Sequence, residues 1–403
     1  MDPISILHEL ILCFDDIMLA TLQSVLKIFS PHGAGRPSIV RTFLNRKRAL
    51  PTFDMACTFL LLGCLTLGCA TTDSVTESVT ETVQEISNPA SGALESSADY
   101  RTGDIREINI PGTSVSFQLV YVSGGNYPVG TEADEVGREE DEGPLVEVAL
   151  SGYWIGRYEV TDTEYSVFRY PDRDADTTAV EGAVYKVDAV SRPSPPYEDP
   201  AFGLGGPSKP AVGMTQWGAM HYAKWLSEKT GVFFRLPTEA EWETACRAGT
   251  DTAYSFGPTS SSIESFGWLA SNSGLELHDV GSKSGNDWGI FDMHGNAAEW
   301  MLDEYVELYH TEISQMAEAD PWIRPTRLHP RTVRGGAFDD PADALRCGAR
   351  LKSTTSWKRR DPQIPKSFWW NTDSPFLGFR LVAPEQAPSP EWQAEFWTLI
   401  LGE

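Results

Sequence analysis

The chain is short of basic side chains for its length. It has 403 residues, with 32 Lys and Arg against 57 Asp and Glu, and a formal net charge of −25 at pH 7. Basic and acidic residues nearly balance over 1–54, so almost all of the negative excess lies downstream. Such a body repels phosphate groups. We therefore expect no nucleic-acid partner.

Histidine is also scarce, and the seven that occur are scattered at positions 8, 32, 221, 278, 294, 310 and 329. They form no His-x-x-x-His-x-Glu run, which excludes a helical iron site of that form. The stretches "GTSVS" (112–116) and "GGPS" (205–208) lack the Gly-x-Ser-x-Gly spacing of a nucleophile elbow. We expect each histidine to be structural or exposed rather than catalytic.

Long apolar runs are missing too. The most apolar stretch, residues 55–68, is shorter than the roughly 20 residues that span a bilayer as a helix. It follows a basic cluster at 41–48 and ends in small residues. This order predicts an export signal. The alternative is a short buried helix.

The end of the apolar run contains two candidate lipidation sites, in "LLGC" (61–64) and "LGC" (67–69). Both resemble a bacterial lipoprotein signal, in which a Cys after a small residue is lipidated and becomes the new N-terminus. Leu61 favours Cys64, whereas the apolar-to-polar edge favours Cys69, so both stay open. The resemblance implies a lipid-anchored protein of the bacterial cell envelope.

The segments around this signal differ in kind. Residues 1–39 precede a signal that should begin the protein; a start codon assigned too early explains them, and an amphipathic helix is the alternative. Residues 70–104 are rich in Ser, Thr, Glu and Ala and almost free of aromatics, which predicts a disordered acidic tether. We therefore divide the chain into a signal segment (1–69), a tether (70–104) and a folded body.

The body mixes two periodicities. Apolar and polar residues alternate in 115–130 and 145–165, which predicts strands there. Apolar residues recur at helical spacing in 215–231 and 235–249, which predicts helices. Thr238 and Glu241 have the spacing of a capping box. Two helices embedded among many short strands indicate an α+β fold.

One long insertion, residues 351–375, combines basic and aromatic side chains on an otherwise acidic protein. It is either a surface that binds a protein or glycan partner or a loop whose tryptophans cap the core. The residues concerned are Trp357, Arg359, Arg360, Trp369 and Trp370.

Eight segments carry a resemblance to a known family. They are "SGGNYPVG", "YWIGRYEVTDTEY", "PAVGMTQWGAMHYAKWL", "RLPTEAEWETACRAG", "WGIFDMHGNAAEW", "RGGAF", "LRCGAR" and "GFRLV". In order and spacing they resemble the formylglycine-generating enzyme family, also called sulfatase-modifying factors. The resemblance covers roughly 112–384 and implies a modified C-type-lectin-like α+β fold with two main helices and little regular secondary structure. It places the domain at 105–384 and leaves a tail, 385–403, able to form a short helix.

The stretch "FDMHGNAAEW" (291–300) matches the family's Asn/Asp-x-x-Gly-Asn-x-x-Glu-Trp motif, which wraps a structural calcium ion. Carried over position by position, the resemblance implies the side chains of Asp292 and Glu299 and the backbone carbonyls of Gly295 and Ala297 as ligands. Calcium prefers hard oxygen atoms of this kind. The alternative is that the two carboxylates cap backbone amides in a tight turn without a metal.

In the oxidising members of the family, two cysteines after "RGG" bind copper(I) and convert a sulfatase cysteine to formylglycine. Here the segment "RGGAFDDPADALRCGAR" (334–350) has Asp340 at the first position when counted forward, and Ala337 and Ala342 when counted back from "RC". Copper(I) prefers thiolate ligands. We therefore expect neither copper nor the family's catalytic residues.

The remaining cysteines of the body, Cys246 and Cys347, match a pair that forms a structural disulfide in the family, and export permits the bond. Two buried free thiols are the alternative.

Family members without the catalytic cysteines occur among envelope lipoproteins, so a binding or scaffold module is one function by analogy. The other is an oxidase, or another oxidoreductase, that uses the same cleft. The missing thiol pair favours the binding module.

Overall fold

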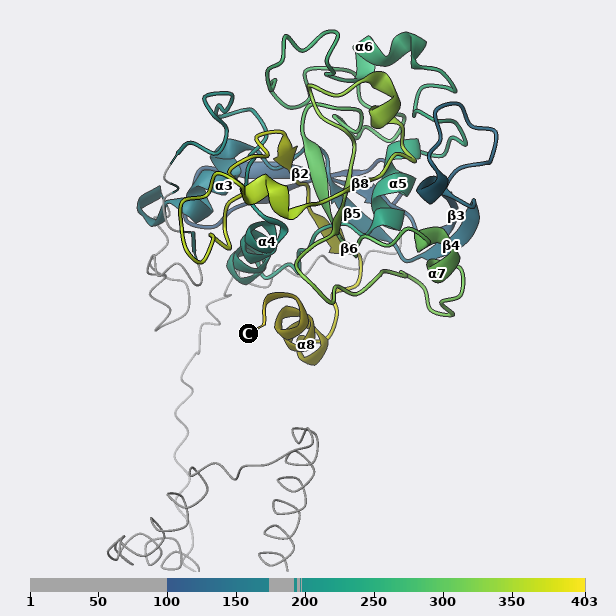
Figure 1. The fold of residues 1–403 in the computed structure, drawn as a ribbon. Coiled ribbons are helices and arrows are strands. Elements are labelled where there is room, and N and C mark those ends of the chain that lie inside the picture. The colour runs from purple at the N-terminus through teal and green to yellow at the C-terminus, as the bar shows by residue number, and fades with distance from the viewer. Residues whose placement is uncertain (1–99, 174–191, 194–195, 197, 403) are drawn as a thin grey trace, which may run out of the picture. The chain divides into compact units, whose positions relative to one another are not determined.

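The computed structural model describes residues 100–173, 192–193, 196 and 198–402 (Figure 1). The expected export signal with Cys64 and Cys69, and the tether as far as residue 99, lie outside these residues. Within the described residues the strands form three small sheets, with helices between and around them.

The first sheet has the order β1-β2-β5-β10, and its neighbouring strands are antiparallel. Its strands are β1 Ile105–Asn109, β2 Ser116–Val122, β5 Tyr153–Gly156 and β10 Val382–Pro384. Successive side chains of β2 point to opposite faces: Leu119 and Tyr121 belong to one apolar cluster, and Val120 and Val122 to another. The sheet therefore separates two parts of the core and is covered on both faces.

The other two sheets are smaller. The second pairs β3 Gly125–Val129 with β4 Val146–Leu150. The third has the order β8-β7-β6-β9, in which β6 and β9 run parallel. Its strands are β6 Ala298–Glu304, β7 Arg331–Arg334, β8 Leu351–Lys352 and β9 Leu377–Gly378. The stretches 115–130 and 145–165 thus contain β2 to β5, as their alternation predicts, but the second stretch does not end as a strand, because a helix capped by Thr161 begins at Asp162.

The helices begin at polar caps. They are α3 Asp162–Arg169, α4 Gln216–Thr230, α5 Glu239–Arg247, α6 Ile263–Phe266, α7 Tyr309–Ile313 and α8 Pro390–Leu401. Thr238 and Glu241 form the expected capping box at the start of α5, and Thr161 and Glu164 form another at α3. Gly231 ends α4 in the left-handed conformation. Short 3-10 turns occur at Glu140–Glu142, Pro171–Arg173, Ser260–Ser262, Ala342–Leu345 and Thr355–Lys358.

The tail beyond residue 384 is an integral part of the packed body. It forms α8, which lies beside α4 (Figure 1) and is the second longest helix in the described part of the chain. Phe396 and Trp397 are buried in the same cluster as Trp225 and Leu226 of α4. The two main helices that the resemblance implies are α4 and α5. The helix α8 lies in the tail beyond residue 384, where the sequence allows a short helix.

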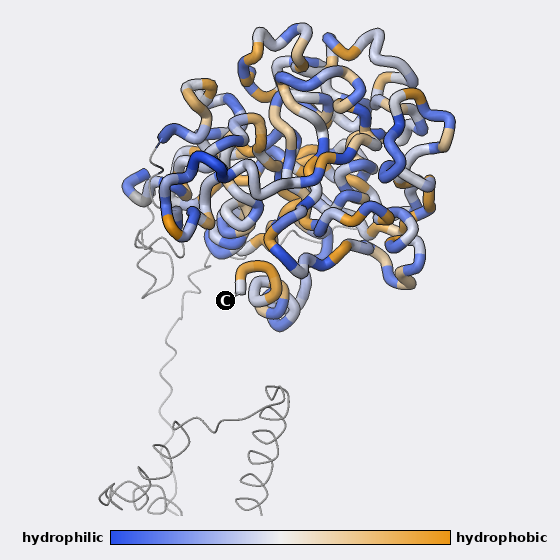
Figure 2. Tube along the Cα trace, viewed as in Figure 1, coloured by the Kyte–Doolittle hydropathy of each residue, from blue (hydrophilic) through white to orange (hydrophobic). Residues whose placement is uncertain are grey.

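Hydrophilic and hydrophobic residues alternate along most of the body (Figure 2), as short half-buried elements require. Among the described helices, no segment combines the length and apolar character needed to cross a membrane. The structure confirms an α+β fold made of many short strands.

Candidate functional site

Strand β7 leads into Gly335 and Gly336, where the chain turns beside a cavity. Both glycines have positive φ, 92° and 66°. A Cβ on Gly336 would lie 2.6 Å from Leu345 Cδ1, so glycine is needed for this path. The cavity has a volume of about 500 Å³, and its walls include Gly335, Asp340, Asp343, Arg346, Arg350 and Lys352. We call it the RGG cavity.

The positions of the family's cysteines lie in the loop that follows. Asp340 is half-buried, and its Oδ2 accepts a hydrogen bond of 2.9 Å from the backbone N–H of Ala337. Burial raises the pKa of Asp340 above its usual value. Ala337 is fully buried and Ala342 is half-buried at the start of a 3-10 turn. At these positions the loop provides one carboxylate and no thiol.

A buried network of ion pairs from α5 holds the basic wall of the RGG cavity. Glu239 pairs with Arg350 at 2.7 Å, and Glu243 pairs with Arg334 at 3.0 Å. Burial alone would raise the pKa of Glu243, but Arg247 and Arg334 lower it to about 2. These glutamates therefore stay charged. Arg334 and Arg350 are therefore held in place by ion pairs with glutamates of the protein itself.

Cys246 of α5 and Cys347 form a disulfide, with their Cα atoms 5.6 Å apart. The bond joins α5 to the end of the loop that follows Gly335 and Gly336. His294 lies beside it, with a ring nitrogen within 4.8 Å of both sulfur atoms. Burial lowers the pKa of His294 to about 4, so its ring is neutral near pH 7. The two sulfur atoms are bonded to each other and fully buried, and they offer no thiolate.

Residues 291–297 form a tight loop rather than a helix. Asp292, Gly295 and Asn296 all have positive φ, of 58°, 101° and 63°. A Cβ on Gly295 would lie 2.0 Å from the carbonyl oxygen of Trp268, so glycine allows the close approach of the two backbones. The loop then enters β6 at Ala298.

This loop contributes to a cluster of three buried carboxylates around one guanidinium. Both oxygens of Glu299 accept hydrogen bonds of 2.7 Å from Arg380. Oδ2 of Asp292 accepts from the Gly281 backbone N–H at 2.6 Å. Among the described residues, no group donates to Oδ1 of Asp292 or to Oε2 of Glu159, and both atoms are buried. Burial raises the pKa of Glu159, and the nearby Asp292 raises it further.

The cluster suits a cation in charge and in donor type. With all three carboxylates ionised, one guanidinium would leave two negative charges uncompensated, which is costly in a buried site; accordingly, burial raises the pKa of both Glu159 and Asp292. The free oxygens of Asp292 and Glu159 are hard donors suited to calcium. The three carboxylates do not converge within 4.8 Å of one another. A cation there would also draw on backbone carbonyls, of which those of Gly295 and Ala297 are the expected ones.

The side chains of the 351–375 loop divide into two groups. Trp369 and Trp370 are buried in the main apolar cluster, and Trp357 packs against that cluster with its ring 5.7 Å from that of Trp300. Arg359 and Arg360 are exposed. The guanidinium of Arg360 pairs with Asp373 at 2.7 Å. The tryptophans thus cap the core, and the arginines lie at the surface.

Two features of the site have no clear signal in the sequence. Glu159 lies far along the chain from the 291–300 stretch, and nothing near it in the sequence marks it as a neighbour of Asp292. The glutamates of α5 resemble ordinary exposed helix residues, yet Glu239 and Glu243 are fully buried. The sequence signal for these buried ion pairs is limited to the arginines of "RGG" and "GAR", Arg334 and Arg350, with which the glutamates pair.

Comparisons with known proteins agree with this geometry. Residues 112–363 match the family described as "Sulfatase-modifying factor enzyme 1-like domain". Formylglycine-generating enzyme of Thermomonospora curvata is 27% identical over 255 residues, which are 55% of this chain and 82% of that protein. The structure of PvdO from Pseudomonas aeruginosa superposes with a TM-score of 0.54 and 25% identity, covering 71% of this chain and all of PvdO.

A further relative is a serine/threonine-protein kinase by name. Pkn1 of Chlamydia pneumoniae is 30% identical over 240 residues, which are 59% of this chain and 35% of that protein. The chain therefore spans about a third of the length of this relative. Because the family match covers well over half of the chain and agrees with the observed fold, the chain belongs to the sulfatase-modifying factor family, in which formylglycine-generating enzymes also fall.

Proposed function

We propose that this protein is a lipid-anchored envelope protein whose family domain binds a partner and does not carry out the copper-dependent oxidation. The observation that carries the proposal is the loop after "RGG", which presents Asp340 in one register, or Ala337 and Ala342 in the other, where the resemblance places the cysteines of the oxidising members. The only cysteines in the described part of the chain, Cys246 and Cys347, are joined to each other and buried.

Copper(I) is a soft ion and prefers thiolates, so the residues present do not fit it. Asp340 offers hard oxygens, and one of them already accepts a hydrogen bond from the backbone. The neighbouring Arg346 is paired with Glu142 and Glu135, and Arg350 is paired with Glu239. The arginines of the RGG cavity are therefore paired within the protein, and its lining offers polar groups but no thiol, which suits recognition of a protein or glycan surface better than copper chemistry.

The competing function is a formylglycine-generating oxidase, or another oxidoreductase, that needs no cysteine pair in this cleft. Its support is the similarity to formylglycine-generating enzymes. The two functions differ in one measurable outcome, the conversion of a cysteine in a Cys-x-Pro-x-Arg peptide to an aldehyde. We expect no conversion.

We also propose a structural calcium ion at the 291–300 loop. Asp292 and Glu299, with the carbonyls of Gly295 and Ala297, would hold it, and Glu159 would supply a third carboxylate. The unpartnered oxygens of Asp292 and Glu159 support the proposal. The ion would neutralise the buried charge and hold the loop against β6. Without it, a proton shared by Asp292 and Glu159 would be needed to relieve the repulsion.

Anchoring remains an expectation from the sequence. Cys64 or Cys69 would carry the lipid, and the acidic segment 70–104 would hold the body away from the membrane. Mass spectrometry of the mature N-terminus should find a diacylated cysteine at one of these two positions. An unmodified N-terminus upstream of residue 55 in the mature protein would exclude the anchor.

A further inference from the structure

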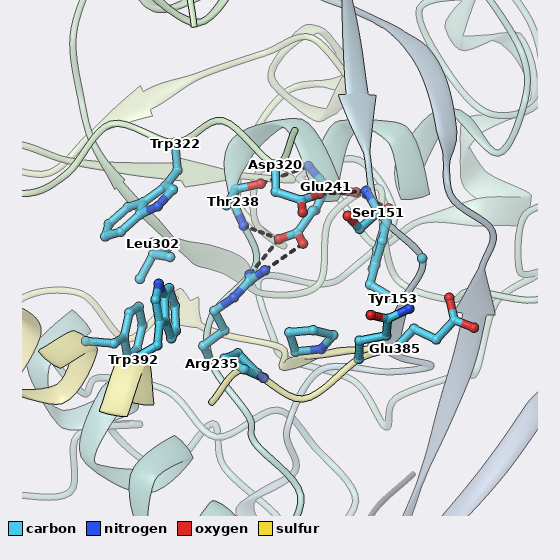
Figure 3. Close-up of a pocket in the computed structure, with 15 residues that line it drawn as sticks. Ser151, Tyr153, Arg235, Thr238, Glu241, Leu302, Asp320, Trp322, Glu385 and Trp392 are labelled. Atoms are coloured by element: carbon cyan, nitrogen blue, oxygen red, sulfur yellow. Dashed lines mark hydrogen bonds and ion pairs between the residues drawn. The ribbon is translucent and has the colours of Figure 1, made fainter. Parts of the chain in front are cut away.

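A second cavity, of about 420 Å³, lies where α8 meets the body (Figure 3). Its walls come from α8, from the segment 384–388 that precedes it, and from residues around 320–322. It shares no wall residue with the RGG cavity. Since α8 lies outside the matched residues 112–363, this cavity involves a part of the chain that the family match does not cover. We call it the α8 cavity.

One side of the α8 cavity is aromatic. Trp322 and Trp392 lie on the same side in Figure 3, and Phe396 packs behind them, with its ring centroid 5.1 Å from that of Trp392 and 6.2 Å from that of Trp322. Trp392 is 40% exposed, whereas Phe396 is buried. The indole rings are therefore supported from behind and remain accessible from the cavity. Indole faces attract cations, because their π-electrons carry negative charge.

The remaining wall carries an excess of negative charge. Arg235 forms two hydrogen bonds with Glu241, of 2.7 and 2.8 Å, and this buried pair is neutral as a unit. Asp320 and Glu385 also line the cavity, and neither forms an ion pair with any group in the described part of the chain. In Figure 3 the Arg235–Glu241 pair lies between the tryptophans and Glu385. The lining thus has two carboxylates that form no ion pair with the part of the chain that the structure describes.

A backbone N–H holds one carboxylate in place, and a tyrosine hydroxyl holds the other. Oδ1 of Asp320 accepts a hydrogen bond of 2.6 Å from the backbone N–H of Ser151, and Oε2 of Glu385 accepts one of 2.8 Å from the hydroxyl of Tyr121. A Cβ on Gly152 would lie 2.2 Å from Oε2 of Glu385, so glycine makes room for that carboxylate. Each carboxylate keeps one oxygen that accepts no hydrogen bond from the described residues, and such fixed groups lose little freedom when they bind a ligand.

A second arginine, besides the paired Arg235, lies near this cavity. Arg324 is exposed, and its guanidinium lies 5.9 Å from the ring centroid of Trp322. It does not belong to the lining. Even when Arg324 is included, the region has more carboxylates than basic groups. The position of Arg324 also shows that a guanidinium can approach the indole of Trp322.

We propose that the α8 cavity binds an organic cation, a guanidinium or alkylammonium group on an apolar stem. An N–H group would donate to the free oxygen of Asp320 or of Glu385 in a charge-assisted hydrogen bond, and the apolar stem would extend toward Trp322 and Trp392 on the aromatic side. An anion would be repelled, and a neutral ligand would leave the two carboxylates uncompensated. The cation could be a free small amine or a basic side chain of a peptide. This inference does not depend on the function proposed for the RGG cavity.

The first test compares ligands that differ only in charge, on the unmodified full-length protein. Butylguanidine and its neutral isostere butylurea are titrated by calorimetry at low salt, and acetyl-arginine amide and acetyl-citrulline amide form a second pair. We expect each cation to bind at least about tenfold more tightly than its isostere. A preference for butylguanidine over acetyl-arginine amide points to a free amine, and the reverse points to a peptide side chain. Equal affinity within both pairs, or no binding at millimolar ligand, would overturn the proposal.

The second test places the cation in this cavity. The double variant Asp320→Asn, Glu385→Gln keeps the shape of the lining and removes its excess charge, and Trp392→Ala removes one ring. We expect both to weaken binding of the preferred cation by about tenfold. Glu395→Gln removes an exposed carboxylate from the same helix, outside the lining, and should leave binding unchanged. If the control weakens binding as much as the double variant, the effect is general electrostatics and the site assignment is wrong.

Discussion

Glu299 and Arg380 form a fully buried ion pair at the centre of the domain. The guanidinium donates to both carboxylate oxygens at 2.7 Å, and it also donates to the carbonyls of Gly156, at 2.9 Å, and Phe291, at 3.0 Å. One side chain thereby joins the end of β5, the 291–297 loop and β6. The Glu of the "EW" segment and the Arg of the "GFR" segment are thus the two partners of this ion pair.

Removing one partner of this pair should be strongly destabilising. Arg380→Met leaves the buried Glu299 carboxylate without its guanidinium partner, and we expect the free energy of unfolding to fall by about 3–5 kcal/mol. The double variant Glu299→Gln, Arg380→Met should lose less than Arg380→Met alone, because no bare charge remains. Urea denaturation followed by tryptophan fluorescence measures both. A single variant that loses less than about 1 kcal/mol would show that the pair is not central to the fold.

The proposed calcium ion predicts a response to chelation. Adding EGTA should lower the melting temperature of the wild-type protein, because an ion bound only to the native state stabilises it by mass action. Asp292→Asn should abolish most of that response while leaving the Glu299–Arg380 pair intact. Glu299→Ala is a poorer probe, since it also breaks that pair. An unchanged melting curve in EGTA would favour the alternative of capped turns and a proton shared with Glu159.

A comparison of two glycines with similar φ angles distinguishes the cost of a steric clash from the cost of an unfavourable backbone conformation. Gly336 has a φ of 66° and Gly274 a φ of 68°. An added Cβ at Gly336 meets Leu345 at 2.6 Å, whereas at Gly274 nothing lies within 4 Å. Gly336→Ala should therefore cost more stability than Gly274→Ala, by about 1–3 kcal/mol. Equal losses in thermal unfolding would mean that the turn beside the RGG cavity tolerates a side chain.

Glu164 predicts a specific pH dependence. Burial raises its pKa from 4.5 to about 7, although its hydrogen bonds to Thr161 act in the opposite direction. The folded state therefore holds this proton more tightly than the unfolded state, and the contribution is complete below pH 4.5 and lost as the pH rises through about 7. Its size is at most about 3.5 kcal/mol, from roughly 1.4 kcal/mol per pH unit. Glu164→Gln should flatten the stability profile over that range; an unchanged slope would contradict the assignment.

Local signals in the sequence predict local structure well. The spacing of Thr238 and Glu241 predicts the start of α5, and the alternation in 115–130 predicts β2 and β3. The family resemblance supplied what spacing alone does not, the pairing of Cys246 with Cys347. These features depend on a few neighbouring residues or on a motif with a known partner.

Contacts between distant segments were not predictable in the same way. Nothing in the sequence around Trp369 and Trp370 decides whether they face the core or the solvent, because that depends on how the 351–375 loop folds back on α4. The approach of Glu159 to Asp292 likewise depends on the arrangement of β5 and the 291–297 loop. The α8 cavity exists only because the tail packs on the body, and helical propensity alone does not show where a helix docks.

The most direct test of the central proposal is an oxidation assay. The copper-loaded protein is incubated with a Cys-x-Pro-x-Arg peptide, oxygen and a thiol reductant, and the peptide is analysed by mass spectrometry. The formylglycine-generating enzyme of Thermomonospora curvata serves as the positive control in the same buffer. We predict that the control forms the aldehyde and that this protein yields no more than the reaction without enzyme. Turnover above that background, abolished by Cys347→Ser, would contradict the account and make the protein an oxidase that uses a different sulfur arrangement.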